Sequence, residues 1–178
     1  MKIEISDKGS EAFYREVVNI SAQYRYILKN HHHKLKDYFR QFTVLLIFGT
    51  VFLVLSLLMG IFWGFDAWSY AVIAILAIAD VMCVGYLVVL NRMLKAMLAD
   101  NRPSVLTLDD TGVELNKGGS QIVKLGWDNI AAVRADRECL TFVSGDRTGI
   151  VISVAKQYAG EIPAWLHENQ PKVEVVNN

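Results

Sequence analysis

The sequence contains few of the residues that build disulfide frameworks, metal centres or rigid turns. Only two cysteines and three prolines occur in 178 residues. Cys83 and Cys139 lie far apart, with neither the density of a secreted disulfide scaffold nor the Cys/His spacing of a zinc site. Basic and acidic residues are balanced at 18 each, which argues against a nucleic-acid-binding protein and against a disordered tail. The length corresponds to about one domain of ordered protein. The cysteine content is compatible with a reducing compartment.

Catalytic motifs are also missing. The sequence has no P-loop, no G-x-S-x-G, no H-E-x-x-H and no glycine-rich dinucleotide motif. Asp109 and Asp110 are adjacent, so on a strand their side chains face opposite ways and cannot act as an acid/base pair. The stretch "NKGGS" predicts a hairpin turn, because no helical pattern follows it to form a phosphate site. We therefore expect no enzyme activity, catalytic residue, cofactor or metal.

Charge is nearly absent from the middle of the chain. Residues 42–90 contain no Lys or Arg and only two acids, Asp66 and Asp80. By contrast, residues 1–41 carry eight basic and five acidic residues, and residues 91–178 carry ten basic and eleven acidic residues. This segregation separates an apolar segment from two polar ones.

Two long apolar runs fill that middle segment. Residues 41–65 are uncharged and residues 67–90 contain one acid, and each run is long enough as a helix to cross a hydrocarbon core of about 30 Å. The connection "GFDAW" allows only a tight turn. The first run follows forty polar residues and is too long for the apolar region of a signal peptide. The sequence predicts a transmembrane helical hairpin over residues 41–91, with spans of about 42–64 and 68–90.

Basic residues flank the open ends of this hairpin and are missing from its turn. They are Lys29, Lys34, Lys36 and Arg40 before the first span and Arg92, Lys95 and Arg102 after the second. Because basic residues favour the cytoplasmic side, we expect a multi-pass protein of the inner membrane with both termini cytoplasmic. Aromatic residues near both boundaries fit this placement.

The segment before the membrane, residues 1–40, predicts a short strand and an amphipathic helix. Ser6 or Asp7 is a candidate N-cap for that helix. Three consecutive histidines, residues 31–33, point in different directions on a helix and therefore lack the same-face spacing of a metal site. We interpret them as a solvated or headgroup-facing cluster.

The segment after the membrane, residues 100–178, has short alternating apolar runs separated by turn residues, which is typical of an antiparallel sheet. An apolar stripe follows at Tyr158, Ile162, Trp165 and Leu166, with helical spacing. Because proline is favoured only in a first turn, Pro163 implies that this helix begins near Gly160 or consists of two short pieces. The predicted fold class is a membrane helical hairpin plus a small α+β domain with a C-terminal helix.

One motif in this domain resembles a known family. The residues are Gly126-Trp127-Asp128-Asn129-Ile130 with Val133, preceded by the turn Asp110-Thr111-Gly112. With two adjacent spans before it, this pattern resembles the YcxB-like bacterial membrane proteins, whose C-terminal domain is similar to bacterial pleckstrin-homology (PH) domains. The resemblance covers nearly the whole chain and implies architecture rather than catalysis.

The residues of this motif have structural interpretations of their own. A tryptophan beside a glycine at the end of a strand predicts a core anchor rather than a ligand platform, because so small a domain must bury its large apolar area. Asp128 is interpreted as a cap or turn acceptor. Gly112 and Ile130 complete the set that we expect to be structural.

Asp80 is the acid in the middle of the second predicted span. An ionised carboxylate there is costly, so we expect it to be neutral, hydrogen-bonded or both. An antiparallel neighbour would present Thr50 and Ser56 at similar depth, and Gly49 and Gly60 would allow the helices to approach closely. The partner is then the hydroxyl of Thr50 or Ser56, or a second copy of Asp80 in a dimer. A proton-carrying role is the alternative.

Three functional classes remain open. The first is a membrane-tethered interaction module that binds a protein partner in preference to a lipid headgroup, because its basic residues are interleaved with acids. The second is a transport or proton-relay subunit that uses Asp80 and has to form a homo-oligomer. The third is a membrane immunity or stress protein that acts on a partner within the bilayer.

Overall fold

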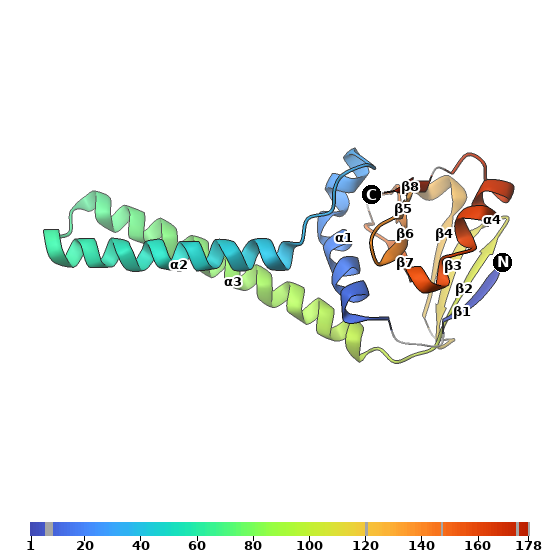
Figure 1. Ribbon diagram of the computed structural model, residues 1–178, viewed down its shortest axis with the longest axis horizontal. Coiled ribbons are helices and arrows are strands. Elements are labelled where there is room, and N and C mark those ends of the chain that lie inside the picture. The colour runs from blue at the N-terminus through green and yellow to red at the C-terminus, as the bar shows by residue number, and fades with distance from the viewer. Residues whose placement is uncertain (6–8, 120, 147, 174, 178) are drawn as a thin grey trace. The chain divides into compact units, whose positions relative to one another are not determined.

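The computed structural model describes residues 1–5, 9–119, 121–146, 148–173 and 175–177 (Figure 1). The chain divides into two compact units. The helix unit comprises residues 36–95, and the sheet unit combines residues 1–35 with residues 96–178. Each unit is described by itself.

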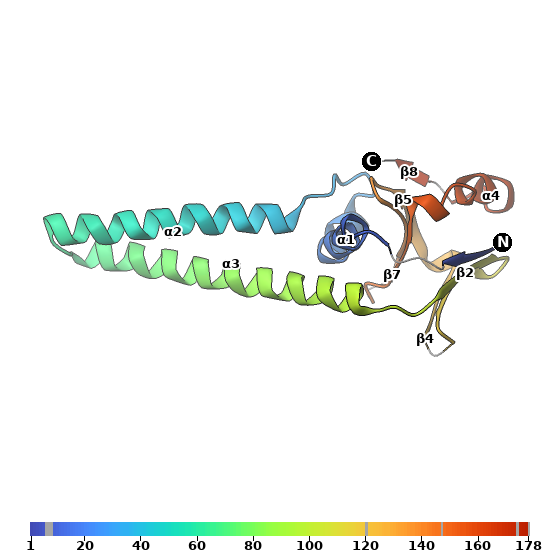
Figure 2. The ribbon, with the colours of Figure 1, turned by 60° about the horizontal axis from the view of Figure 1, so that its bottom comes forward.

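The helix unit is an antiparallel pair, α2 (Tyr38–Trp63) and α3 (Ala67–Ala99) (Figure 2). The carboxylate of Asp37 caps α2 by accepting from the backbone N–H of Arg40 at 3.3 Å. Gly64 ends it with φ of 90°, a conformation that favours glycine. Both helices are long and apolar enough to cross a membrane. α2 covers the first predicted span except for its last residue, Gly64, and α3 covers the second and continues nine residues beyond it.

The less exposed side chains of these two helices repeat at alternating spacings of three and four residues. In α2 they are Phe39, Phe42, Leu46, Gly49, Leu53, Ser56 and Gly60. In α3 this series is Ser69, Ile73, Leu76, Asp80, Cys83, Leu87, Leu90 and Leu94, and a few neighbours such as Val72, Ala77 and Met93 are also less exposed. This heptad spacing is that of a left-handed helix pair. The seam between the helices therefore holds the less exposed residues, and large apolar side chains cover the outside.

The sheet unit contains two four-stranded sheets, with strand orders β1-β2-β3-β4 and β7-β6-β5-β8. Their strands are β1 (Lys2–Ile5), β2 (Ser104–Asp109), β3 (Gly112–Lys117), β4 (Gln121–Gly126), β5 (Ile130–Ala135), β6 (Cys139–Ser144), β7 (Val151–Ala155) and β8 (Val175–Asn177). All pairings are antiparallel except that of β5 with β8. The expected antiparallel sheet is thus confirmed, as two sheets.

The core of the sheet unit lies between these two sheets. Side chains that are fully buried there include Leu106, Leu108, Val113, Val133, Phe142, Ile152, Ile162 and Leu166. The first six of these residues lie at inward-facing positions of β2, β3, β5, β6 and β7, because a strand directs successive side chains to opposite faces. Ile162 and Leu166 belong to α4 (Ile162–Asn169), which covers the core.

The N-terminal segment, which was predicted as a part of its own, belongs to the sheet unit. β1 pairs with β2, from Lys2 opposite Thr107 to Ile5 opposite Ser104. Helix α1 (Glu11–Lys29) packs on β6 and β7, with Ile20, Tyr24 and Ile27 in a second apolar cluster beside Cys139 and Val143 (Figure 1). Pairing and packing across so long a sequence separation leave no trace in local periodicity.

The cap of α1 also differs from expectation. Ser10 is the N-cap, and its hydroxyl accepts from the backbone N–H of Phe13 at 3.1 Å. The predicted caps Ser6 and Asp7 lie outside the described residues.

The C-terminal helix is confirmed as two short pieces, a 3₁₀ turn (Lys156–Tyr158) and α4. Pro163 lies in the first turn of α4, where its missing N–H leaves no intrahelical bond unmade. Strand β8 after α4 was not predicted, because three residues are too few to show alternation. A second 3₁₀ turn (Trp127–Asn129) joins β4 to β5.

Candidate functional site

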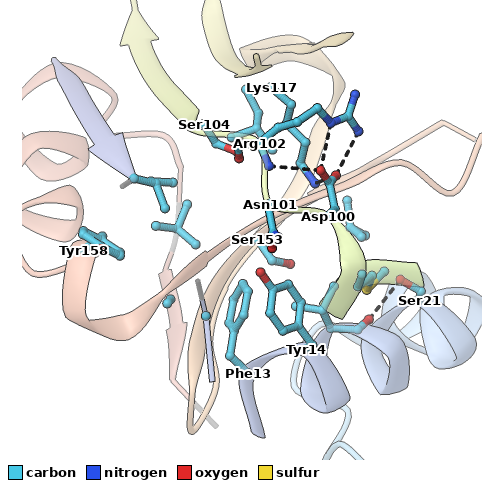
Figure 3. Close-up of a pocket in the computed structure, with 18 residues that line it drawn as sticks. Phe13, Tyr14, Ser21, Asp100, Asn101, Arg102, Ser104, Lys117, Ser153 and Tyr158 are labelled. Atoms are coloured by element: carbon cyan, nitrogen blue, oxygen red, sulfur yellow. Dashed lines mark hydrogen bonds and ion pairs between the residues drawn. The ribbon is translucent and has the colours of Figure 1, made fainter. Parts of the chain in front are cut away.

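A cavity of about 210 Å³ opens beside β7 in the sheet unit. Its walls come from α1, from the last turn of α3 with the segment that follows it, from β2 and β3, and from β7. Figure 3 shows the residues that line it, with the rings of Phe13 and Tyr14 on one side, Asp100, Arg102 and Lys117 on the other, and Ser153 between. The cavity therefore joins an apolar wall to a charged rim.

The apolar wall is built around the start of α1. The rings of Phe13 and Tyr14 meet edge to face with centroids 5.0 Å apart. A side chain at Gly9 would collide with the Phe13 ring, so glycine allows this ring to lie against the backbone. Further apolar surface comes from Val17, Met97, Leu115, Val151, Val154 and Tyr158.

The charged rim is a cluster of two cations around one carboxylate. Arg102 binds Asp100 bidentately, with Nε to Oδ1 at 2.8 Å and Nη2 to Oδ2 at 2.9 Å. Lys117 Nζ lies 3.6 Å from Oδ2 of the same carboxylate. These hydrogen bonds and charges hold the pKa of Asp100 well below its usual value. The described residues of the rim carry one net positive charge, and both cations are more than a third exposed.

The backbone of β7 borders the cavity along its free edge. β7 ends its sheet, with β6 on one side only. Between β6 and β7, the backbone N–H of Ser144 donates to the carbonyl of Ile150, and that of Lys156 donates to the carbonyl of Glu138. These two bonds, with the strand register, show which opposite residues of β6 and β7 are hydrogen-bonded to each other. The alternation of antiparallel pairs then directs the N–H and C=O groups of Val151, Ser153 and Ala155 away from β6. None of these groups has a hydrogen-bond partner among the described residues.

Asp80 is brought to one of its predicted partners. Thr50 Oγ1 donates to Asp80 Oδ2 at 3.0 Å within the helix unit. Gly49 makes room for this contact, because a Cβ there would collide with Asp80 Oδ1. Ser56 lies six residues beyond Thr50 on α2, about 9 Å along the helix, and makes no hydrogen bond to Asp80. Gly60 accommodates the ring of Phe65 instead of α3.

Trp127 is a half-buried anchor at the edge of the core. Its indole Nε1 donates to the backbone carbonyl of Asp109 at 2.8 Å, and its ring lies near that of Trp165, with centroids 6.0 Å apart. Ile130 packs against the same core. Through Trp127 and Ile130 the motif is part of the packed structure of the sheet unit.

The turn acceptor in this region is Asp109 rather than Asp128. Asp109 Oδ1 accepts from the Thr111 hydroxyl at 2.5 Å and from the backbone N–H groups of Thr111 at 2.7 Å and Gly112 at 3.1 Å, and these hydrogen bonds, the hydroxyl first, lower its pKa. At Gly112 an added Cβ would collide with the carbonyl of Leu125, so β3 and β4 can approach here only with glycine. Asp128 is exposed, and the 3₁₀ turn that contains it has no side-chain cap. The "DDTG" sequence could have identified Asp109, because Asp two or three residues before Gly is a common turn acceptor.

A buried ion pair that sequence reasoning missed holds the histidine segment. Arg134 is fully buried and binds Asp136 bidentately, with Nη2 to Oδ1 at 2.8 Å and Nε to Oδ2 at 3.1 Å. Its Nη1 donates to the carbonyls of His31 and His33, each at 3.1 Å. This segment is thus held through its backbone carbonyls, and the His33 ring also stacks on that of Tyr26, with centroids 5.8 Å apart. Among the described residues no His/Cys/Asp/Glu group could hold a metal.

Two further contacts of α1 involve ionisable groups. Glu16 accepts from the N–H of Glu138 at 3.1 Å, and its burial with Asp136 nearby raises its pKa. Tyr24 donates to the carbonyl of Ser144 at 2.7 Å, and burial raises its pKa. Burial also raises the pKa of the Cys139 thiol, which is therefore not a reactive thiolate.

Comparison with known proteins yields no similar protein. No protein-family model, curated protein or solved structure matches the chain. The functional argument therefore depends on the two units themselves.

Proposed function

We propose that the protein is a non-enzymatic membrane protein whose PH-like domain, the sheet unit, is held at the inner leaflet to bind a protein partner. The observation that carries this proposal is that one chain combines two units with different surfaces. The outer surface of the helix pair is apolar and suits lipid, whereas the sheet unit buries its apolar side chains and suits water. All the helix faces outside the seam of α2 and α3 expose large apolar side chains, such as Ile61 at 68% and Val81 at 72%. Such surfaces are stable in lipid and not in water.

The PH-like assignment is supported by the order of elements. Three consecutive strands, β2 to β4, belong to one sheet, three more, β5 to β7, belong to the second, and α4 follows before the short strand β8 joins the second sheet. We infer membership of the YcxB-like family from the same order together with the motif at Trp127. Strand β1 and helix α1 are additions from the other side of the predicted hairpin.

The chain length keeps the domain near the membrane. If the second span ends near Leu90, nine residues lie between it and Asp100, and even a fully extended chain would cover at most about 35 Å over this distance. The two connections, before α2 and after α3, tether the same unit twice. A partner bound there is therefore presented close to the bilayer.

The basic residues favour a protein partner over a phosphorylated lipid headgroup. A headgroup site needs clustered cations that are not already neutralised. Arg134 is buried against Asp136, and Arg102 and Lys117 share Asp100. The rim of the cavity keeps one excess positive charge rather than the several that such a headgroup requires.

Membrane topology is tested with cysteine labelling in a background that lacks Cys83 and Cys139. Single cysteines replace Ser10, Asp66 and Glu168, which are all exposed. We expect an impermeant thiol reagent applied to intact cells to label position 66 and to leave positions 10 and 168 unlabelled. Labelling of position 168 from outside would refute the cytoplasmic placement of the sheet unit.

Partner binding is tested by photocrosslinking in cells from Glu168 and from Ile122, two exposed positions of the sheet unit. A discrete protein adduct supports the interaction module. Adducts obtained only from positions on the outer faces of α2 and α3, such as Phe52, would instead support a partner within the bilayer. Adducts of the chain with itself alone would support a homo-oligomer.

A further inference from the structure

β7 is an edge strand whose side chains include neither charge nor proline, although α1 packs beside it. Exposed strand edges are commonly guarded by charged residues or proline, because their free backbone groups can pair with another chain. The edge strand β1 carries Lys2 and Glu4, and the edge strand β4 carries Lys124. The five residues of β7 are Val-Ile-Ser-Val-Ala, with neither charge nor proline.

The free backbone groups of β7 coincide with the cavity. Val151, Ser153 and Ala155 direct their N–H and C=O groups outward, and the same three residues line the cavity. A strand added there would lie about 4.8 Å from β7. Alternate side chains of that strand would point to one face, where a suitable one can enter the cavity.

The size of the cavity selects one large apolar side chain. An engineered cavity of about 150 Å³ lined by apolar groups binds a benzene ring. The cavity here measures about 210 Å³ and has Phe13, Val17 and Leu115 in its walls. It therefore accommodates a side chain such as Leu, Phe or Trp, which is the type of anchor that dominates peptide recognition.

The positive charge of the rim favours a ligand that has an acidic residue next to its large apolar side chain. Lys117 and Arg102 share a single carboxylate, that of Asp100, Arg102 also donates to Gln121 Oε1 at 3.1 Å, and both cations remain more than a third exposed. A second carboxylate on the ligand would complete the pairing. An amphiphile could match the charge and the apolar wall, but it has no backbone to pair with β7.

From these observations we propose that β7 and the cavity beside it bind an extended peptide segment of the partner by strand addition. The segment pairs with Val151, Ser153 and Ala155, inserts one large apolar side chain into the cavity, and places an Asp or Glu near Lys117 and Arg102. This mode is β-augmentation, in which backbone hydrogen bonds supply affinity and a side-chain pocket supplies specificity. The inference rests on the proposed function and specifies where and what the protein partner binds.

The test begins with a phage-displayed library of random twelve-residue peptides, selected on the full chain in lipid nanodiscs with empty nanodiscs as counter-selection. We expect the selected peptides to share a large apolar residue with an acidic residue close to it. A synthetic peptide with that sequence is then used as the probe for affinity measurements. Failure to select any peptide, or selection of basic peptides, would overturn the proposal.

Ser153 offers a matched pair of variants. Ser153→Pro and Ser153→Ala both remove the hydroxyl, which contacts that of Thr141 at 2.9 Å, but only proline removes the outward N–H. We expect Ser153→Pro to weaken binding of the probe about tenfold and Ser153→Ala to leave it nearly unchanged. Equal affinities of the two variants would exclude pairing at β7.

A second measurement keeps the test valid if Ser153→Pro does not fold. Probe peptides with N-methyl groups on alternate residues are compared in the two alternating patterns, using the unchanged protein. Only the pattern that blocks the groups facing β7 will weaken binding, since the other pattern faces solvent. Equal effects of both patterns would contradict strand addition.

The charged rim is tested with Lys117→Glu, and Lys124→Glu on β4 is the control with the same change in net charge. We expect roughly fivefold weaker binding for the first and little change for the second. If the partner captured by crosslinking is unaffected by Ser153→Pro, this inference fails while the proposed function stands. If position 168 is labelled from outside, the proposed function fails whatever the peptide affinities are.

Discussion

The two units solve the same problem, an ionisable group among apolar side chains, in different ways. In the sheet unit Arg134 is fully buried, and its guanidinium makes two hydrogen bonds to Asp136 and two to backbone carbonyls. In the helix unit Asp80 accepts one hydrogen bond, from Thr50. The first group is neutralised by its own unit, which provides four hydrogen bonds for its five N–H donors. The second has spare acceptor capacity, which a proton, or another chain, can use.

The outer surfaces of the two units differ as much as their polar groups. The sheet unit hides Phe142 and Ile152 completely, whereas the helix unit exposes 79% of Trp63 and 77% of Phe62. Burial of apolar area from water stabilises the first unit. The second has almost no such burial, so its pairing depends on close packing and on the few polar contacts along the seam. Mutations should therefore have larger effects in the sheet unit.

The largest effect is expected at Arg134. Arg134→Ala leaves Asp136 buried without its cation and frees the carbonyls of His31 and His33, so we expect a loss of about 3 to 5 kcal/mol in unfolding free energy. Urea unfolding of the full chain in nanodiscs, followed through Trp127 and Trp165 after Trp63→Phe and Trp68→Phe, measures it. The neighbouring Arg137, whose side chain is 90% exposed, is the control. Equal stabilities of Arg134→Ala and Arg137→Ala would show that the buried contacts of Arg134 do not stabilise the fold.

Trp127 should have an intermediate effect. Full burial would predict about 3 to 5 kcal/mol for Trp127→Ala, but the ring is only half-buried and its anchor includes one hydrogen bond. We expect about 2 kcal/mol in urea unfolding followed by circular dichroism. Phe142→Ala, at a fully buried position, is the reference for a complete core loss. Unchanged stability of Trp127→Ala with loss of the partner would make this residue a binding residue.

A smaller effect is expected along the seam of the helix unit. Gly49→Ala forces Asp80 away from Thr50, whereas Gly85→Ala adds a methyl group where nothing lies within 4 Å. Interhelical hydrogen bonds of this kind contribute about 1 kcal/mol. The efficiency of disulfide trapping between cysteines at Phe42 and Tyr86, whose rings lie 4.4 Å apart, reports the pairing. We expect lower trapping for Gly49→Ala and unchanged trapping for Gly85→Ala.

The same assay separates the two roles of Asp80. A structural acceptor tolerates Asp80→Asn, which keeps its hydrogen-bonding groups, and suffers from Asp80→Leu, which removes them. If Asp80→Asn instead abolishes partner binding or transport while trapping stays normal, the ionisable proton is required. That result would favour the proton-relay class over the interaction module.

The smallest effect concerns pH. Because burial raises the pKa of Glu16 above its ordinary 4.5, the protonated form favours the folded state. The stabilisation is fully present below about pH 4.5 and is lost as the pH rises through the folded-state pKa. As the pH is raised from about 4.5 through the folded-state pKa, urea unfolding should therefore show that the native chain loses stability relative to Glu16→Gln. Glu11→Gln at the exposed start of α1 is the control and should keep the native pH slope.

Local patterns of the sequence predicted much of this structure. The uncharged run before Trp63 could only be a long apolar helix, and the turns at Gly112 and Gly118 separate strands whose alternation matches the observed burial. Pro163 correctly implied that the helix begins near Gly160 or consists of two pieces, because α4 begins at Ile162 after a separate 3₁₀ turn. The hydrogen bond from Thr50 to Asp80 followed from depth in an antiparallel pair.

The features that were missed depend on contacts between distant residues. Nothing near Lys2 shows that β1 pairs with β2, and nothing near Arg134 shows that its guanidinium binds the histidine segment. The unpaired edge of β7 is a property of strand order, which alternation does not encode. Ser56 was over-predicted because one face of a helix contains several polar candidates and only register selects among them.

The division of the sheet unit between both ends of the chain has a consequence for synthesis. Ile5 pairs with Ser104, so β1 must wait for roughly one hundred further residues, about 5 to 20 s of translation. During that interval the apolar face of α1 is uncovered, while both long helices emerge from the ribosome. Antiparallel pairing of α2 with α3, which the proposed membrane insertion would impose, then brings the two distant ends together and removes most of the entropy cost of closing so long a loop. Membrane insertion would thus act as a step in the maturation of the domain outside it.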